Sequence, residues 1–358
     1  MVVFRFLLIF SFAFSTILSA FVDKLYITNG LGDSVTVIKA SDYTFLSTLS
    51  GGSFNFNQPI TLALTPNGEY VYVANRGNNS VTVIKTSDDS FVANLISPMY
   101  NFDTPQLISF SPDGAYAYIP NSGNDTLTVI KTSDFSLVSN FPGFDHPVQS
   151  AVSPDGKFLY VANSSGDNIS VVKTSDNSIF TTLDQATFML DQESTLAITP
   201  DGSYLYTANR GSDSVSVIKI PENTFVANLS GMPFQFNGPD YIKISPDGQH
   251  VYVSNTSGTT VTVIKIPENT FVANITVGND PLGLGFNLGQ SLFYVVNTAS
   301  DNVSVIDSAT NTVIATLMAG FGFNFPTDIA SLPALINPPS SVKREGCQFL
   351  FQTELFAR

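Results

Sequence analysis

Histidine and cysteine, two side chains well suited to acid–base and nucleophilic chemistry, are scarce in this 358-residue chain. It holds two histidines, His146 and His250, and one cysteine, Cys347. The two histidines fall in different repeats and at opposite ends of the expected strands. Neither a histidine-based metal site nor a serine–histidine relay is therefore indicated. The sequence predicts no catalytic residues, no metal site and no cofactor.

Three charged residues are the best candidates for catalysis if the chain is an enzyme. Asp240, Lys243 and Asp328 fall in segments that are expected to line a central channel, where almost every other residue is uncharged. A hydrolase needs ionisable groups that meet in such a space. Asp240, Lys243 and Asp328 could act together only if the fold brings them close to one another across the channel.

An aromatic motif, Phe-Asn/Asp-x-Pro, recurs in five connecting segments that precede predicted strands. Two arginines and several aspartates flank these segments. We see two interpretations: the rings either tuck over the ends of neighbouring units as a lid, or form an exposed rim for a protein, glycan or apolar ligand. The candidate binding residues are Phe56, Phe102, Phe144, Phe236, Phe323, Arg76 and Arg210.

A repeated unit must position all of these residues. Tyr-x-x-Asn occurs seven times, with the asparagines 46 or 42 residues apart: Asn29, Asn75, Asn121, Asn163, Asn209, Asn255 and Asn297. Each unit holds four runs of strong β-formers separated by clusters of Pro, Asp, Asn and Gly, which favour turns. Four-stranded antiparallel units at this period arrange radially as propeller blades. The repeated tyrosines and asparagines are expected to be structural, with the asparagines in left-handed turn positions.

The ends of the chain predict how the ring closes. The first copy begins at Lys24 without an innermost strand, and residues 326–332 resemble an innermost strand with no successor. We therefore predict an all-β, seven-bladed β-propeller over residues 24–332, closed by a C-terminal innermost strand that joins the N-terminal blade. Residues 333–358 are either a tail or the truncated start of a second β module.

Composition limits location and partners. Arg5 followed by an apolar run to Leu18 is typical of a signal peptide over residues 1–20. We expect a secreted or cell-surface protein, with the periplasm as an alternative, and no integral membrane segment once the signal is removed. A net charge of −14 argues against nucleic acid as a partner.

The repeats resemble the YVTN family of β-propellers found in microbial surface-layer and secreted proteins. Clear matches are 72–75, 160–163 and 252–255, and the resemblance covers about residues 24–332. Residues 337–342 resemble the opening of a fibronectin type III-like module. The YVTN resemblance implies either a surface protein or a lactonase-like enzyme. The sequence favours a non-enzymatic, exported surface module that binds a protein or glycan, or is structural, and that uses the Phe-Asn/Asp-x-Pro face. The alternative is a secreted lactonase-like hydrolase with ionisable groups at the channel.

Overall fold

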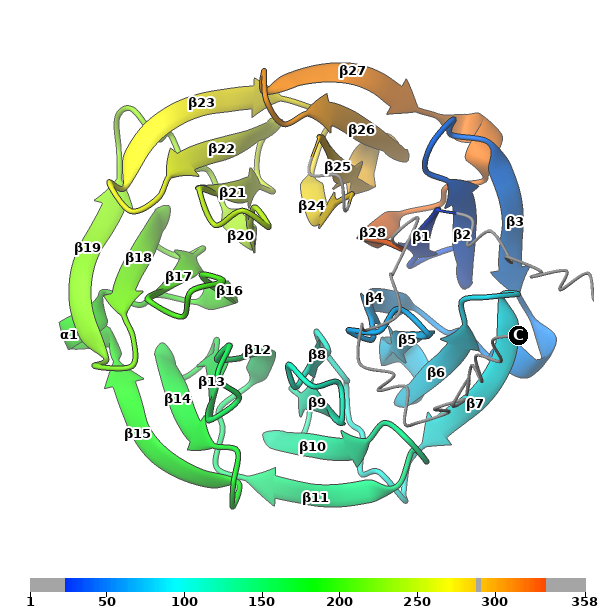
Figure 1. The fold of residues 1–358 in the computed structure, drawn as a ribbon, viewed down its shortest axis with the longest axis horizontal. Coiled ribbons are helices and arrows are strands. Elements are labelled where there is room, and N and C mark those ends of the chain that lie inside the picture. Colours follow the sequence, from blue (N-terminus) through cyan, green and yellow to red (C-terminus); the bar gives the residue numbers. More distant parts are fainter. Residues whose placement is uncertain (1–22, 288–290, 333–358) are drawn as a thin grey trace, which may run out of the picture.

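Seven four-stranded antiparallel sheets stand around a central channel in the computed structural model, which describes residues 23–287 and 291–332 (Figure 1). The predicted seven-bladed all-β propeller is confirmed. The predicted signal peptide, and the tail or fibronectin-like segment after residue 332, lie outside the described residues. Within those residues, no helix is both long and apolar enough to cross a membrane.

Each blade contributes one strand to each of four concentric rings. The innermost strands are β28 (Pro326–Ser331), β4 (Pro59–Leu64), β8 (Ser109–Phe110), β12 (Pro147–Val152), β16 (Glu193–Ile198), β20 (Pro239–Ile244) and β24 (Pro281–Phe286). The second strands, which carry Tyr-x-x-Asn, are β1 (Lys24–Asn29), β5 (Tyr70–Asn75), β9 (Tyr116–Asn121), β13 (Phe158–Asn163), β17 (Tyr204–Asn209), β21 (His250–Asn255) and β25 (Leu292–Asn297). Blades are numbered 1 to 7 in this order.

The third strands are β2 (Ser34–Lys39), β6 (Ser80–Lys85), β10 (Thr126–Lys131), β14 (Asn168–Lys173), β18 (Ser214–Lys219), β22 (Thr260–Lys265) and β26 (Asn302–Asp307). The outermost are β3 (Phe45–Ser50), β7 (Ser90–Ile96), β11 (Leu137–Pro142), β15 (Ser178–Asp184), β19 (Thr224–Ser230), β23 (Thr270–Thr276) and β27 (Thr312–Leu317). Short helices occupy some connections: α1 (Gln185–Phe188) and the 3₁₀ turns η1 (Gly52–Phe54), η2 (Arg76–Asn78), η3 (Thr298–Ser300) and η4 (Ala319–Phe321).

Blade 1 closes the ring as predicted. Strand β28 pairs antiparallel with β1, and Ile27 lies opposite Ile329. The ammonium group of Lys24 then reaches blade 2, where it lies 2.8 Å from a carboxylate oxygen of Asp89 and donates to the carbonyl of Thr86. The C-terminal strand and this ion pair join the two ends of the described chain to the same part of the ring.

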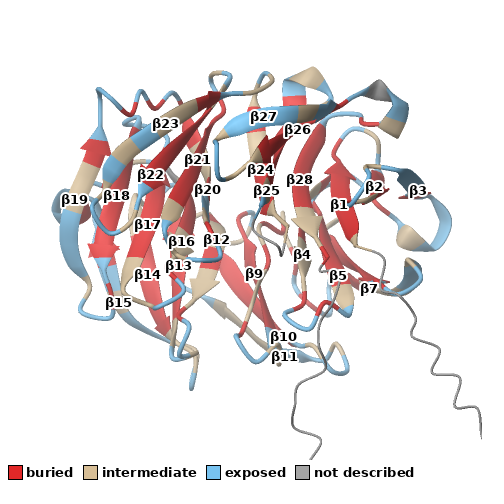
Figure 2. Ribbon diagram, turned by 45° about the horizontal axis from the view of Figure 1, so that its top comes forward, coloured by how far each residue is buried: buried red, intermediate tan, exposed pale blue. Residues whose placement is uncertain are grey.

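The core consists of apolar layers between adjacent blades. Second and third strands are buried on both faces, whereas outermost strands have exposed residues (Figure 2). The seven motif tyrosines are all buried, and several donate a hydrogen bond to the outer turn of the next blade, as Tyr206 does to Asn269 at 2.7 Å. A tyrosine ring that is buried while its hydroxyl finds a hydrogen-bond partner is the packing expected for this residue.

The motif asparagines are structural, but not through left-handed torsions. Asn75 and Asn297 are extended, with φ of −102° and −106°. Each motif asparagine instead donates its side-chain amide to the third strand of its own blade, at the fifth and seventh residues onward; Asn209, for example, donates to Ser214 and Ser216 at 3.1 and 2.9 Å. The expected torsion was wrong because a buried side-chain amide can hold the strands together without a turn.

Left-handed torsions occur four residues later, at Asp or Asn, in six of the seven repeats. The side chain there accepts the backbone N–H of the segment entering the next innermost strand. Asp125 accepts from His146 at 2.8 Å and Asp301 from Phe325 at 2.7 Å. These aspartate and asparagine side chains therefore fix the blade-to-blade connections.

Blade 3 departs from the pattern at Pro120. The carbonyl of Pro120 accepts a hydrogen bond from the N–H of Gln106, in the innermost segment of the same blade. Proline has no N–H to return the bond, which weakens the ladder there. The regular strand β8 is accordingly two residues long, while Gln106 and Leu107 before it lie outside that strand and line the channel.

Candidate active site at the channel mouth

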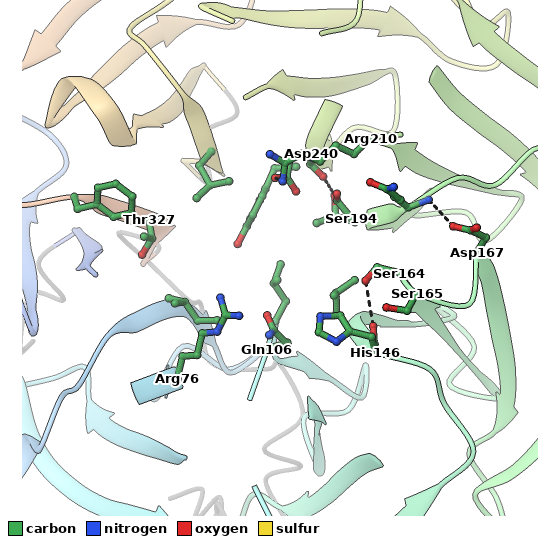
Figure 3. Close-up of a pocket in the computed structure, with 18 residues that line it drawn as sticks. Arg76, Gln106, His146, Ser164, Ser165, Asp167, Ser194, Arg210, Asp240 and Thr327 are labelled. Atoms are coloured by element: carbon green, nitrogen blue, oxygen red, sulfur yellow. Dashed lines mark hydrogen bonds and ion pairs between the residues drawn. The ribbon is translucent and has the colours of Figure 1, made fainter. Parts of the chain in front are cut away.

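A cavity of about 730 Å³ occupies one end of the channel, on the face that carries the Asn-rich turns and the blade-to-blade connections (Figure 3). The side chains labelled in Figure 3 point into it from the inner rim of the blades. Arg76 and Arg210 enter from opposite sides, and Asp240 lies next to Arg210. A concave space with a few convergent polar groups is the usual form of a small-molecule site.

The second residue of each innermost segment lines this cavity. Several innermost strands have an irregular register at their start, for example between Pro239 and Ile242. An extra residue at such a bulge re-aims a side chain. The residues presented in this way are Ile60, Gln106, Val148, Ser194, Asp240, Leu282 and Thr327.

Two further positions of the repeat complete the lining. The residue directly after the motif asparagine contributes Arg76, Ser164 and Arg210. The residue before each innermost strand has a left-handed backbone and contributes His146, at φ 53°, Gln192 and Phe325. All three lining positions vary from blade to blade, unlike the Tyr and Asn of the motif.

Asp240 and Arg210 form an ion pair in the cavity wall. A guanidinium nitrogen lies 3.5 Å from a carboxylate oxygen, and the side chains are 16% and 52% exposed for Asp240 and Arg210. Burial raises the pKa of Asp240, whereas Arg210 and a hydrogen bond from Ser194 lower it. Burial likewise raises the pKa of Asp280, and the charge of Arg210 lowers it. Asp240 is thus a carboxylate held in position and more basic than an exposed aspartate.

Arg76 and His146 supply the other polar groups that act at the mouth. Arg76 is exposed and has no ion-pair or hydrogen-bond partner for its guanidinium within residues 23–287 and 291–332; the His146 imidazole likewise has none in that part of the chain. Both are free to meet a ligand. In the same part of the chain, no group of three His, Cys, Asp or Glu residues is placed to hold a metal ion.

The phenylalanines of the Phe-Asn/Asp-x-Pro motif are buried between blades. Phe56, Phe102, Phe144, Phe236 and Phe323 are only 2–8% exposed. Four of them stack on the aromatic ring two residues earlier, as Phe234 and Phe236 do at 5.5 Å between centroids. The rings have the lid arrangement and present no exposed aromatic rim, because the connection folds them onto the ends of the strands.

Asp240, Lys243 and Asp328 do not form one constellation. Lys243 and Asp328 line a second cavity, beyond Leu107 and Tyr241, which border both cavities. Asp328 is buried and accepts from the Thr61 hydroxyl at 2.8 Å and the Leu62 N–H at 3.1 Å. Asp328 therefore ties blade 1 to blade 2.

The comparisons with known proteins bear directly on this site. The family model described as "Lactonase, 7-bladed beta-propeller" matches residues 18–134, 95–190, 178–271 and 229–318, which together span 18–318. The chain belongs to this family. A search of curated proteins finds no match.

Solved structures share the fold of this lactonase-family chain. A periplasmic gluconolactonase of Pseudomonas aeruginosa is 17% identical, with 87% of this chain and 99% of that one covered and a TM-score of 0.69. A putative 6-phosphogluconolactonase of Bacteroides uniformis is 15% identical (86% and 99% covered, TM-score 0.71). Hydrazine synthase of Kuenenia stuttgartiensis is 21% identical (80% and 92% covered, TM-score 0.70). At these identities the likeness concerns the fold alone, and it extends across proteins with different names.

The family membership corrects the functional expectation. A surface module for binding or structure was the favoured prediction, and the match to the lactonase family model overturns it. The expectation that any enzymatic activity would be lactonase-like agrees with the family. The prediction was wrong because the innermost strands carry few ionisable groups, whereas Arg76, Arg210 and His146 reach the channel from the turns.

Proposed function

We propose that the protein is a hydrolase that opens a lactone ring in the mouth cavity, with Asp240 as the general base. The observation that carries this proposal is the Asp240–Arg210 ion pair in the wall of a cavity of about 730 Å³, in a member of the lactonase family. Positioned acid–base groups of raised basicity accelerate such reactions by roughly 10²–10⁴-fold.

The reaction needs one water and one base. Asp240 takes a proton from water as the water oxygen bonds to the lactone carbonyl carbon, giving a tetrahedral oxyanion. A guanidinium, that of Arg76 or Arg210, stabilises this negative charge. The intermediate collapses as the bond between the carbonyl carbon and the ring oxygen breaks, and the ring oxygen takes the proton back from Asp240. The product is a hydroxy acid.

The lining favours a lactone that carries several hydroxyl groups. Side-chain amides and hydroxyls that are at least partly exposed occupy part of the wall: Ser164, Ser165, Gln192 and Ser194. Such groups recognise hydroxyls by hydrogen bonds and reject analogues that lack them. The names of the Pseudomonas and Bacteroides neighbours refer to sugar-derived lactones, which supports the same class.

A pH-stat assay tests the proposal. Hydrolysis of glucono-δ-lactone near neutral pH releases a proton, and we expect uptake of base to exceed the spontaneous rate in proportion to protein concentration. A panel of γ- and δ-lactones with and without hydroxyl groups then reports the preference. No acceleration of any lactone by purified, folded protein would refute the proposal.

We further propose that the protein works outside the cytoplasm. The leader-like residues 1–20 support export, and the Pseudomonas neighbour is named as periplasmic. The likeness of the repeats to YVTN proteins makes the cell surface the alternative site. Fractionation of the producing cell distinguishes the two, and retention of the full-length protein in the cytoplasm would contradict export.

A further inference from the structure

The second cavity holds about 520 Å³ at the opposite end of the channel, beside the turns that contain Pro200 and Pro246. Leu107 and Tyr241 line both this cavity and the mouth cavity. Tyr241 belongs to blade 6, and Leu107 to the segment before β8 in blade 3. The volume lies within the ~300–1,000 Å³ typical of small-molecule pockets.

Lys243 is an exception in the wall of this cavity. It is the fifth residue of its innermost strand, and the six equivalent residues are Ala63, Ser109, Ala151, Ala197, Gly285 and Ala330. Small side chains in six blades leave space at this level of the channel. The lysine from blade 6 borders that space and is exposed within it.

The charge of Lys243 has no counter-ion in contact. Six lysines and arginines in the described part of the chain form ion pairs within 4.0 Å, and Lys243 is not among them. Asp328 attracts it from a greater distance, but its carboxylate already accepts from Thr61, Leu62 and Ile329. An exposed ammonium group in a pocket wall, with no carboxylate in contact, can form a charge-assisted hydrogen bond with an anionic ligand.

The rest of the wall combines polar side chains with an apolar part. Partly exposed side chains line it at the sixth position of five innermost strands: Leu64, Phe110, Ile198, Ile244 and Phe286. These side chains pack partly against the apolar clusters between blades, and an anion that carried only hydroxyl groups would leave their exposed parts uncovered by apolar atoms. A ligand with a short hydrocarbon body would bury them at about 25 cal/mol for each Å².

We propose that this second cavity binds a small amphipathic anion, an organic acid whose carboxylate pairs with Lys243 and whose hydrocarbon body lies against the apolar wall. The site is distinct from the mouth cavity, with which its lining shares only Leu107 and Tyr241. It does not depend on lactone hydrolysis.

Isothermal titration calorimetry with three probes tests the site. Octanoate has both the charge and the hydrocarbon body, acetate has only the charge, and 1-octanol has only the body. We expect octanoate to bind with 1:1 stoichiometry and at least tenfold more tightly than either other probe. Equal binding of octanoate and octanol, or no detectable binding of millimolar octanoate, would overturn the proposal.

Variants locate the binding. Lys243→Met keeps the aliphatic part of the side chain and removes the charge. It should lower the affinity for octanoate at least tenfold, because one charge-assisted hydrogen bond is lost. Lys243→Gln is the second variant should the first fail to fold. Lys265→Met, on β22 of the same blade, and Arg76→Met, in the mouth cavity, should bind as wild type. Unchanged affinity in a folded Lys243 variant, or loss of binding in Arg76→Met, would refute the site.

Discussion

Asn209 and Arg210 are neighbours in the chain, but they belong to two regions of the ring with different tasks. Asn209 is buried and hydrogen-bonds two serines of its own blade, in an arrangement that all seven blades share. Arg210 points into the mouth cavity and pairs with Asp240 of the next blade. The first position is the same in every repeat and the second is not.

The same contrast separates the two channel carboxylates. Asp328 is surrounded by donors from the backbone and Thr61, so it holds blades together. Asp240 has an arginine beside it and faces open volume. In a propeller, side chains whose hydrogen bonds are satisfied by the ring itself maintain the ring, and polar side chains that face the mouth are available for chemistry.

Replacing Asp240 with Asn should have the largest effect. The amide keeps the shape but cannot take a proton from water, so we expect kcat/KM for lactone hydrolysis to fall about 100- to 1,000-fold. Asp247→Asn, in an exposed turn on the opposite face, is the matched control and should retain wild-type activity. Full activity in a folded Asp240→Asn would remove Asp240 from the reaction.

Replacing Asp328 with Ala should instead reduce stability. Three buried donors would lose their acceptor: the Thr61 hydroxyl and the Leu62 and Ile329 N–H groups. Each orphaned group costs about 1–3 kcal/mol, and removal of a buried carboxylate offsets part of this cost. We expect the free energy of unfolding in urea to fall by about 2–4 kcal/mol, with Asp328→Asn less affected because it keeps an acceptor oxygen. If Asp240→Ala proved the more destabilising of the two alanine variants, the roles assigned to the carboxylates would be reversed.

The adjacent pair in blade 5 gives a smaller contrast. Asn209→Ala removes two buried hydrogen bonds, and we expect a loss of about 1–2 kcal/mol in unfolding free energy with KM unchanged. Arg210→Ala should leave stability within about 0.5 kcal/mol, since its side chain is half exposed, while lowering kcat/KM. Urea denaturation and steady-state kinetics of both variants measure the two effects. A large loss of stability in Arg210→Ala, or a changed KM in Asn209→Ala, would contradict the separation of roles.

The pH profile offers the subtlest test. The pKa of Asp240 is raised by burial and lowered by Arg210. Activity that needs the carboxylate should therefore rise with pH through a pKa above that of an ordinary aspartate. Arg210→Met removes the lowering influence, so the acidic limb should move to higher pH. A limb that stayed in place, or moved to lower pH, would show that another group controls the reaction.

The fold was predictable because the repeat encodes it seven times. Tyr-x-x-Asn at a nearly constant spacing, with Pro-Asp-Gly turns between β-rich runs, determines strand number, order and closure at Lys24 and Pro326. The phenylalanines could not be placed from sequence, since an aromatic residue in a connection suits either a lid or a rim, and only the packing of Phe236 on Phe234 decides.

Part of the mouth cavity could be predicted from the sequence. With the repeats aligned, the residue after each asparagine shows Arg76 and Arg210 against Gly, Ser and Thr elsewhere, a difference that marks a non-structural position. That Arg210 meets Asp240 could not be inferred, because the bulge that aims Asp240 into the cavity is a feature of the register and leaves no residue signature.

The most direct test of the account is a crystal structure of Asp240→Asn soaked with a lactone that the wild-type protein hydrolyses. The intact lactone should lie in the mouth cavity, with its carbonyl carbon facing the substituted side chain through one water and its carbonyl oxygen near Arg76 or Arg210. A lactone bound in the second cavity, or on the outer surface with the mouth empty, would contradict the assignment of the channel mouth as the active site.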